Sequence, residues 1–285
     1  MANQPYLSAD AACDEPWDLK MPSDSQQSSH PSGDGRGARP RERLTHPPKR
    51  GDHFWLRLVV GLLLGFTLLW AGLSIGSYSW NAWRAYAGYL KYEPQEGDVI
   101  FQSLPYGPVV LAIEGVTKSP YSHCGVVGQR DGQWIVYEAI GSVRITPLKK
   151  FLWRGRGGGF AVYRLRDEHR EHIPETLRCC EKYLGRPYDY RYQLDDESIY
   201  CSELIYKSFR DATNGQQLGE LRKFGDMNWG PYETLIRQIE GGDVPINREM
   251  ITPRDLARAK QLEPVFSHRL PIELAIENAG EKVMP

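Results

Sequence analysis

One long segment of the chain carries no charged side chain, and this segment limits the folds available to it. From Leu58 to Trp83 the sequence contains no Asp, Glu, Lys or Arg. A helix needs about 20 apolar residues to cross a bilayer, and this segment exceeds that length. Aromatic residues typical of membrane–water interfaces lie within and beside it: Trp55, Trp70, Tyr78, Trp80 and Trp83. We therefore expect a transmembrane signal-anchor helix over residues 54–83.

Two other interpretations of this segment stay open. A buried core helix fits less well, because the run is apolar all round and separates a polar tail from a new domain. A cleaved signal peptide usually has an apolar region of about 7–15 residues near the very start of the chain. Cleavage after Ala87 would release the domain that follows.

The charges on either side of the segment predict its orientation. Residues 35–57 contain seven Lys or Arg and two acids, whereas residues 1–34 contain six acids and one base. Only Arg84 and Lys91 follow closely, among several acids. The positive-inside rule then predicts a single-pass inner (plasma) membrane protein with a cytoplasmic N-terminus. The domain after residue 84 would be extracytoplasmic, which in a bacterium is the periplasm.

Composition excludes several classes of protein. Of 285 residues, 41% are hydrophobic and 25% charged, as in ordinary globular proteins, and five cysteines are too few for a disulfide scaffold. The net charge of −1 gives no basic field for nucleic acid. No Walker, GxGxxG or HExxH motif occurs. We expect no nucleic-acid partner, no metal and no cofactor. Residues 1–53, rich in Ser, Pro, Gly and Asp, are expected to form a disordered cytoplasmic tail.

Beyond a linker at 84–96, the chain predicts one α+β domain over 97–266 and a C-terminal tail at 267–285. Alternating and β-branched runs predict strands at 99–101, 122–128, 134–140 and 160–165. Apolar periodicity predicts helices at 173–184 and 201–212. Thr252 and Pro253 fit the N-cap and first residue of a short helix. The Gly-rich stretch 214–248 is expected to be irregular.

Cys201 stands where a helix should begin. An irregular polar run precedes it, and Leu204, Ile205 and Phe209 form the apolar face of the helix that follows. The unpaired N–H groups and the dipole at a helix N-terminus stabilise a thiolate. A nucleophilic thiolate also needs a partner base.

His123 is the best candidate for that base, and Glu138 for the residue that orients it. A two-residue turn centred on Asp131 and Gly132 would pair Gly125 with Glu138. His123 and Glu138 would then be diagonal neighbours on one face of a hairpin, about 7–8 Å apart at the backbone. Gly125 would leave room between them. One imidazole nitrogen could then face the carboxylate and the other the thiol.

Each residue also has a simpler interpretation. A cysteine before a helix is more often a small buried residue, and a histidine on a strand is usually hydrogen-bonded in a core or at an edge. The joint pattern of Cys201, His123 and Glu138 favours catalysis. Cys124 should point to the face opposite His123, and we interpret it as core.

The motifs and their order resemble the NlpC-type cysteine hydrolases, and more narrowly their YiiX/YebB-like branch. The resemblance covers about residues 95–265 and rests on these segments: Gly97-Asp98-Val99-Ile100-Phe101, Ser122-His123-Cys124-Gly125-Val126, Leu184-Gly185-Arg186-Pro187-Tyr188-Asp189, Tyr200-Cys201-Ser202-Glu203-Leu204 and Thr252-Pro253-Arg254-Asp255-Leu256-Ala257. It implies a circularly permuted papain-like fold in which a central antiparallel sheet packs against the cysteine helix.

The resemblance also implies roles for individual residues. Cys201 would be the nucleophile, His123 the general base and Glu138 the orienting residue. Tyr188 matches a family position near the site and would shape the pocket or the oxyanion region. Tyr200, Ser202 and Glu203 are further substrate-binding or oxyanion candidates, although Glu203 also fits a first-turn acid favoured by the helix dipole. Residues 214–248 depart from a minimal version of the fold, so substrate specificity does not carry over.

Three functions remain open on the sequence. The first is a membrane-anchored cysteine hydrolase that cleaves an amide bond in a peptide, with cell-wall peptide (peptidoglycan) as the analogous substrate. The second is a lipid acyl hydrolase or acyltransferase of the same fold, acting near the bilayer. The third is a non-catalytic envelope binding protein. Analysis of products distinguishes the first two, and a thiol of ordinary pKa would favour the third.

Overall fold

The computed structural model describes residues 52–273. Residues 1–51 and 274–285 lie outside the described range, so most of the predicted tail and the end of the C-terminal segment are not covered. The helices are α1 (Asp52–Tyr89), α2 (Pro108–Thr117), α3 (Leu148–Arg154), α4 (Ile173–Lys182), α5 (Cys201–Ala212), α6 (Glu233–Glu240) and α7 (Pro253–Ala257). The strands are β1 (Val99–Gln102), β2 (His123–Arg130), β3 (Gln133–Ile140), β4 (Ser142–Pro147), β5 (Phe160–Leu165), β6 (Arg222–Lys223), β7 (Glu249–Met250) and β8 (Leu262–His268).

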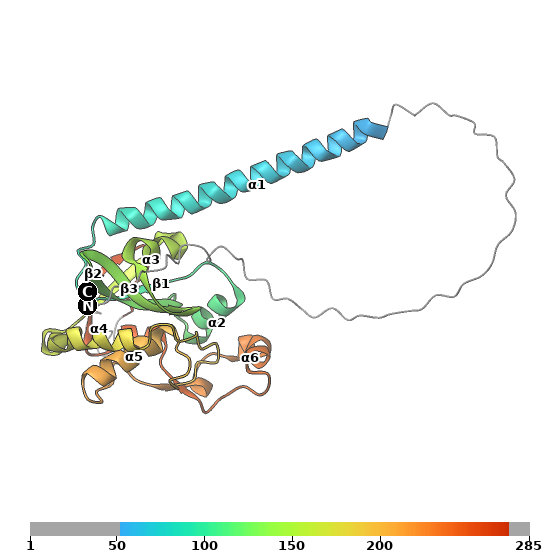
Figure 1. Cartoon of the computed structure of the whole chain (residues 1–285). Helices are drawn as coiled ribbons and strands as arrows, with labels where there is room; N and C mark the ends of the chain where they lie inside the picture. The colour runs from blue at the N-terminus through green and yellow to red at the C-terminus, as the bar shows by residue number, and fades with distance from the viewer. Residues whose placement is uncertain (1–51, 274–285) are drawn as a thin grey trace, which may run out of the picture. The chain divides into compact units, whose positions relative to one another are not determined.

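Six strands form one antiparallel sheet in the order β4-β3-β2-β1-β5-β8. Figure 1 labels β1, β2 and β3 of this sheet. The predicted hairpin register is confirmed, because Gly125 pairs with Glu138 and Gln129 pairs with Trp134. Turn residues Asp131 and Gly132 both have positive φ, as such a tight connection requires. The predicted α+β class with a central antiparallel sheet is therefore confirmed.

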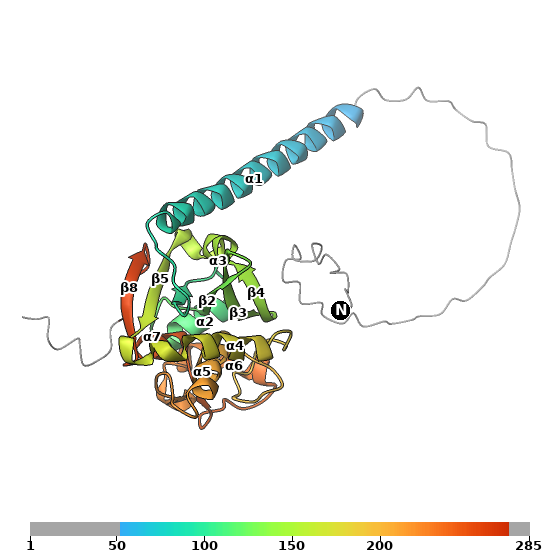
Figure 2. The ribbon, with the colours of Figure 1, turned by 60° about the vertical axis from the view of Figure 1, so that its left-hand side comes forward.

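Helices cover both faces of the sheet, as the turned view in Figure 2 shows. On one face α4 and α5 pack against a core that includes Phe101, Val126 and Leu204. On the other face Phe151 of α3 packs with Val127 and other buried side chains. Because both faces are buried, β2 is apolar along most of its length and does not alternate with polar residues.

Several helices match the sequence-based predictions, and others were not predicted. The structure contains the helix predicted at Cys201–Ala212 with the same bounds. The helix predicted at 173–184 ends at Lys182. The short helix after Thr252 also occurs, with the Thr252 hydroxyl accepting the Asp255 backbone N–H at 3.2 Å. The helices α2 and α3 and the strands β4 and β8 were not predicted, because their apolar runs are short.

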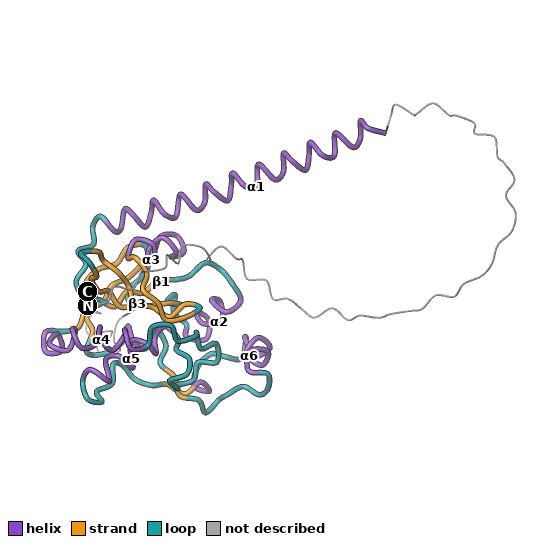
Figure 3. Tube along the Cα trace, viewed as in Figure 1, coloured by secondary structure: helices purple, strands orange, loops and turns teal. Residues whose placement is uncertain are grey.

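Two predicted segments differ from the structure. Residues 214–248 are not simply irregular, since they contain α6 and a short strand that pairs with Glu249 and Met250 (Figure 3). The segment 84–96 is not simply a linker, because α1 continues to Tyr89. A Cβ on Gly88 would lie 2.6 Å from the His268 ring, so the end of α1 packs closely on β8.

The first half of α1 is the apolar part. Among the described residues, Phe54–Gly72 is the one helical segment long and apolar enough to span a membrane, with a mean hydropathy of 1.9. Its side chains are exposed in the structure. By length and composition it is a candidate membrane span.

Candidate active site

Cys201 is the first residue of α5, and Tyr200 is its N-cap. The Glu203 carboxylate accepts the Tyr200 backbone N–H at 3.1 Å, which is one half of a capping box. The first N–H groups of the helix have no partner within the helix. The partial positive charge of the helix N-terminus therefore lies at Cys201.

The start of α5 is tied to the segment before α7. The Ser202 hydroxyl donates to the Ile251 carbonyl at 2.9 Å, and the Ile251 N–H donates to the Tyr200 hydroxyl at 3.1 Å. Both residues are buried. Sequence reasoning offered Tyr200 and Ser202 as substrate or oxyanion contacts. Their polar groups instead bond to Ile251, which favours a positioning role.

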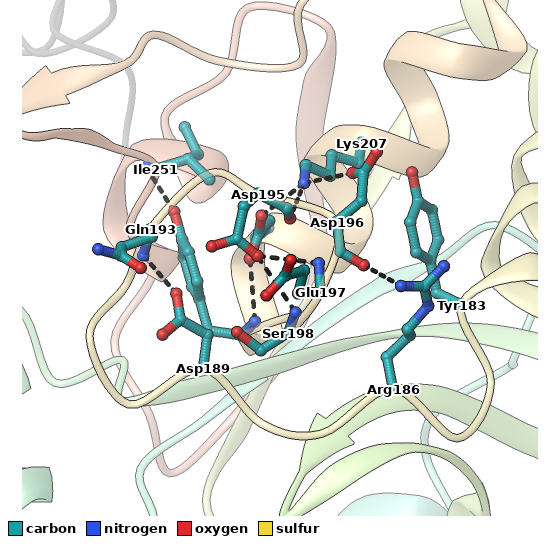
Figure 4. Close-up of polar contacts among 12 residues, drawn as sticks. Tyr183, Arg186, Asp189, Gln193, Asp195, Asp196, Glu197, Ser198, Lys207 and Ile251 are labelled. Carbon is teal, nitrogen blue, oxygen red and sulfur yellow. Dashed lines mark hydrogen bonds and ion pairs between the residues drawn. The ribbon is translucent and has the colours of Figure 1, made fainter.

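A buried ion pair fixes the loop that leads into α5. Lys207 is 2% exposed, and its ammonium lies 2.8 Å from the carboxylates of Glu203 and Asp196. It also donates to the Asp195 carbonyl (Figure 4). Burial raises the pKa of Glu203 to about 8, although Lys207 opposes this. Glu203 therefore caps and anchors the helix, which matches its simpler interpretation.

Asp189 organises the other end of the same loop. Its carboxylate accepts the backbone N–H of Arg191 at 2.8 Å and that of Gln193 (Figure 4). The backbone N–H of Ile199 donates to the Pro187 carbonyl at 2.9 Å. This hydrogen bond closes the loop between Pro187 and Ile199, and the closed loop fixes the position of Cys201, two residues after Ile199.

His123 and Glu138 meet as the hairpin register predicts. Imidazole Nε2 lies 2.6 Å from Glu138 Oε2, and both side chains are buried. Gly125 lies opposite Glu138 in the register. A Cβ there would lie 2.4 Å from Val136 Cγ1 and 2.9 Å from the Tyr137 carbonyl oxygen. Glycine is therefore the residue that this position accommodates.

Glu138 has two further partners that sequence reasoning missed. The Thr146 hydroxyl donates to Oε1 at 2.5 Å, and Arg154 Nη2 donates to Oε2 at 2.6 Å. Burial raises the pKa of Glu138, but the bonds from His123 and Arg154 outweigh it and lower the pKa to about 2. A prediction of strand β4 would have placed Thr146 on the strand next to Glu138. Arg154 ends α3, a helix the sequence did not reveal.

The Cys201 thiol lies close enough to the His123 imidazole and the Cys124 thiol for both groups to affect its pKa. The pKa of Cys201 is well below its ordinary value, because Cys124 and His123 stabilise the thiolate. Burial acts in the opposite direction and is outweighed. Burial lowers the pKa of His123, but its bonds to Cys201 and Glu138 outweigh this and raise it. The arrangement favours a thiolate–imidazolium pair. Because Nε2 faces Glu138, Nδ1 is the nitrogen left for the thiol.

Cys124 has more than the core role expected of it. It is fully buried in the core on the α5 side of the sheet, whereas His123 stacks on Phe151 on the other side. The prediction that the two side chains face opposite ways is therefore confirmed. That it shares a core cluster with Cys201 and affects the pKa of that thiol was not anticipated. Burial and the negative charge at Cys201 raise the pKa of Cys124 well above its ordinary value, so it stays a thiol that can donate.

Tyr188 also lies near the thiol. The segment before it runs along β4, with the Tyr188 N–H donating to the Gly141 carbonyl at 3.0 Å and the Val143 N–H to the Arg186 carbonyl at 2.8 Å. Burial, with added effects of Tyr192 and Cys201, raises the pKa of Tyr188 well above its ordinary value. Its hydroxyl therefore keeps its proton.

The family of the chain follows from comparison with known proteins. Residues 93–266 match the family model described as "Permuted papain-like amidase enzyme, YaeF/YiiX, C92 family". The chain belongs to this family. It is therefore a member of a class of papain-like amidases, which are thiol-dependent hydrolases with peptide-like substrates.

Relatives in Escherichia coli extend this result. An uncharacterized protein YiiX of strain K12 is 31% identical over 180 residues, which cover 61% of this chain and 87% of the relative. The crystal structure of the metalloprotein YiiX from strain O157:H7 superposes with a TM-score of 0.57 at 30% identity. It covers 63% of this chain and all of the relative. The permuted papain-like fold expected from the resemblance is thus confirmed.

The word metalloprotein describes that relative. In residues 52–273 of the present chain, no group of three or more His, Cys, Asp or Glu side chains is arranged to hold a metal ion. The residues described therefore do not form a recognisable metal site.

Proposed function

We propose that this chain is a membrane-anchored cysteine amidase in which Cys201, His123 and Glu138 act as nucleophile, base and orienting residue. One observation carries the proposal: a buried carboxylate holds the His123 imidazole at 2.6 Å, and this imidazole affects the pKa of the Cys201 thiol at the N-terminus of α5. Nucleophile, base and orienter in series are the arrangement of cysteine hydrolases. Family membership supports the same reaction class.

The proposed reaction has two halves. The Cys201 thiolate attacks the amide carbonyl carbon, and the oxygen becomes an oxyanion next to the N–H of Cys201 and the Tyr188 hydroxyl. The C–N bond then breaks as the His123 imidazolium gives its proton to the leaving amine. The resulting thioester is attacked by water, whose proton passes to His123. The C–S bond breaks, and a carboxylic acid and the thiolate–imidazolium pair remain.

The orientation and substrate follow from charge and location. Basic residues before α1 favour a cytoplasmic N-terminus and an extracytoplasmic domain. In a bacterium this would bring the site to peptides of the cell wall, and the family implies a peptide-like amide. An apolar groove lined by side chains of α2 and α6 opens beside Cys201, and it favours a lipid-like acyl group as the second candidate.

The first experiment is the pH dependence of alkylation at each cysteine of the full chain, measured by mass spectrometry. Wild type should show Cys201 alkylated fastest, with an apparent pKa well below the ordinary value of about 8.5. His123→Ala should remove that advantage, while Cys179 keeps its slow rate as an internal control. A Cys201 that titrates like an ordinary thiol in both proteins would contradict the proposal and favour a binding protein.

A further inference from the structure

A polar cavity lies next to the groove that Cys201 lines. Its volume is about 330 Å³, at the lower end of the range for small-molecule sites. Four residues line both the cavity and the groove: Val116, Thr117, Met227 and Thr252. A substrate held at Cys201 can therefore extend past these residues into the cavity.

The walls of the cavity are tied to the start of α5 and to each other. The Ser202 hydroxyl donates to the Ile251 carbonyl at 2.9 Å, and Thr252 is the next residue along the chain. On the opposite wall, the backbone N–H of Asn228 donates to the Val116 carbonyl at 3.1 Å. The cavity is therefore a built part of the fold, in a fixed position relative to the proposed nucleophile.

Positive side chains outnumber negative ones in the lining. The charged residues of the cavity are three bases and two acids: Lys118, Arg222, Arg254, Asp226 and Asp255. Asp255 is already engaged, because its carboxylate accepts the Thr252 hydroxyl at 2.6 Å and lies 3.2 Å from Arg222 Nε. Asp226 is exposed to solvent. The lining as a whole is positive by one charge.

Arg254 is a cation without an acidic partner in the part of the chain that the structure describes. The neighbouring arginines take the acids instead, since Arg222 pairs with Asp255 at 3.2 Å and Arg258 with Glu273 at 2.8 Å. Burial and the charge of Arg258 accordingly lower the pKa of Arg254. A bound anion would stabilise this half-buried guanidinium.

The hydrogen-bond donors of Arg254 are also partly unused. Its Nη1 donates to the Thr117 carbonyl at 2.7 Å. Its Nε is buried and has no hydrogen-bond partner among residues 52–273. Leaving a buried donor unpaired is unfavourable, so such a group indicates an acceptor that a ligand supplies. Carboxylates bind a guanidinium through two neighbouring nitrogens, and Nε and Nη2 form such an edge.

We propose that the substrate is an acidic peptide, whose carboxylate binds Arg254 in this cavity while the scissile amide meets Cys201. The inference rests on the proposed function, because it assigns the substrate class of that same site. A carboxylate carries one negative charge, which matches the net charge of the lining, whereas a phosphate dianion would exceed it. A neutral substrate would leave Arg254 without a counterion.

The test measures alkylation of Cys201 in the full chain by pairs of reagents that differ only in charge. Each pair is an N-iodoacetyl ω-amino acid and its primary amide, with one to five methylenes between the nitrogen and the carboxyl carbon. The thiolate forms a C–S bond to the iodoacetyl methylene as the C–I bond breaks, and iodide leaves. Mass spectrometry gives both rates, and their ratio cancels the reactivity of the thiol itself.

The acid-to-amide ratio should depend on Arg254. At the spacer length that fits best, we expect Arg254→Gln to lower the ratio by about tenfold, since a charge-assisted hydrogen bond is lost. Arg254→Lys should retain part of the preference, because it keeps the charge and loses the two-nitrogen edge. Asp226→Asn should raise the ratio, because it removes a negative charge from the lining.

Arg237→Gln is the matched control. It removes the same charge from a residue of α6 that is 47% exposed and lines neither the cavity nor the groove. It should keep the wild-type ratio. Lys118→Gln is a second cavity variant if Arg254→Gln fails to fold, and it should lower the ratio about two- to threefold, as for an exposed charge.

Two results would overturn the inference. One is the same ratio at every spacer length in wild type and in the cavity variants that fold. The other is an equal loss in Arg237→Gln and Arg254→Gln, which would reflect the net charge of the protein and not a site. The neutral amides separate the two proposals. If they find no activated Cys201, the proposed function fails; if they do and the ratio ignores Arg254, only the acidic substrate is excluded.

Discussion

The pKa of the proposed nucleophile, Cys201, is lowered by a neighbouring thiol and a neighbouring imidazole. Cys201 is 2% exposed, so its thiolate depends on partners more than on water. Cys124 and His123 supply them directly, and Glu138 stabilises the imidazolium. The acid limb of activity should report protonation of Cys201 and the alkaline limb loss of the proton from His123. Because the groups are coupled, both limbs belong to the site as a whole.

Arg154 is the residue through which this balance can be tested. Its guanidinium and the His123 imidazole both lie 2.6 Å from Glu138 Oε2, so two cations share one carboxylate oxygen. Removing Arg154 removes a positive charge that disfavours the imidazolium. We expect Arg154→Gln to move the alkaline limb of kcat/KM upward by roughly one pH unit.

Arg154→Lys should return the limb toward its wild-type position, because it restores the charge. The pH–rate profile on an amide substrate is the measurement, with unfolding followed alongside. A profile that does not move in Arg154→Gln while thermal stability falls would show that Arg154 serves the fold alone.

At the scale of elements, the site is built where the ends of a strand and a helix meet. β2 begins at His123 and α5 begins at Cys201. The helix is held by three groups of contacts: the Glu203 cap, the Lys207 pair and the bonds to Ile251. These contacts fix the direction of the first N–H groups, which the proposed reaction requires.

Glu203 makes the stability of this helix start dependent on pH. Its pKa is about 8 in the folded chain and about 4.3 in an unfolded one, so the folded state binds more protons between these values. Its contribution to stability is therefore complete below about pH 4.3, declines as pH rises, and is lost above about pH 8. Glu203→Gln should flatten this decline.

The measurement is the denaturant midpoint of the full chain between pH 4 and 9. Glu197→Gln is the matched control, since Glu197 lies in the loop before α5 and is exposed. It should keep the wild-type slope. A Glu203→Gln protein with the same slope as wild type would show that the decline has another origin.

At the scale of the whole molecule, the proposed function joins a catalytic domain to an apolar helix. Phe54–Gly72 can span a bilayer by length and composition, and six basic residues between positions 35 and 50 precede it. A reporter enzyme fused after Pro285 should therefore give an extracytoplasmic signal, and the chain should sediment with membranes.

Deletion of residues 54–72 is the control and should release the chain into the soluble fraction. A cytoplasmic signal from the full fusion would overturn the proposed topology. Sedimentation unchanged by the deletion would mean that another surface attaches the protein to the membrane.

Much of the site could be predicted from sequence because its determinants are local. The turn at Asp131 and Gly132 sets the hairpin register, and that register places His123 beside Glu138. The apolar face of α5 and the polar run before it locate Cys201 at a helix start. Alternation, turn chemistry and helix periodicity are short-range properties, so one sequence contains them.

Only the tertiary structure decided the rest, because those contacts join residues distant in the chain. Arg154 reaches Glu138 from a helix without a clear periodic signal, and Cys124 meets Cys201 across the core. The groove exists because α2 packs against a segment more than a hundred residues away, through Asn228 and Tyr232. The alternation of side chains along one strand shows which residues share a face of the sheet, but it does not show which helix covers that face. The sequence by itself therefore determined the reactive groups, and the packing determined their partners and the surface that meets the substrate.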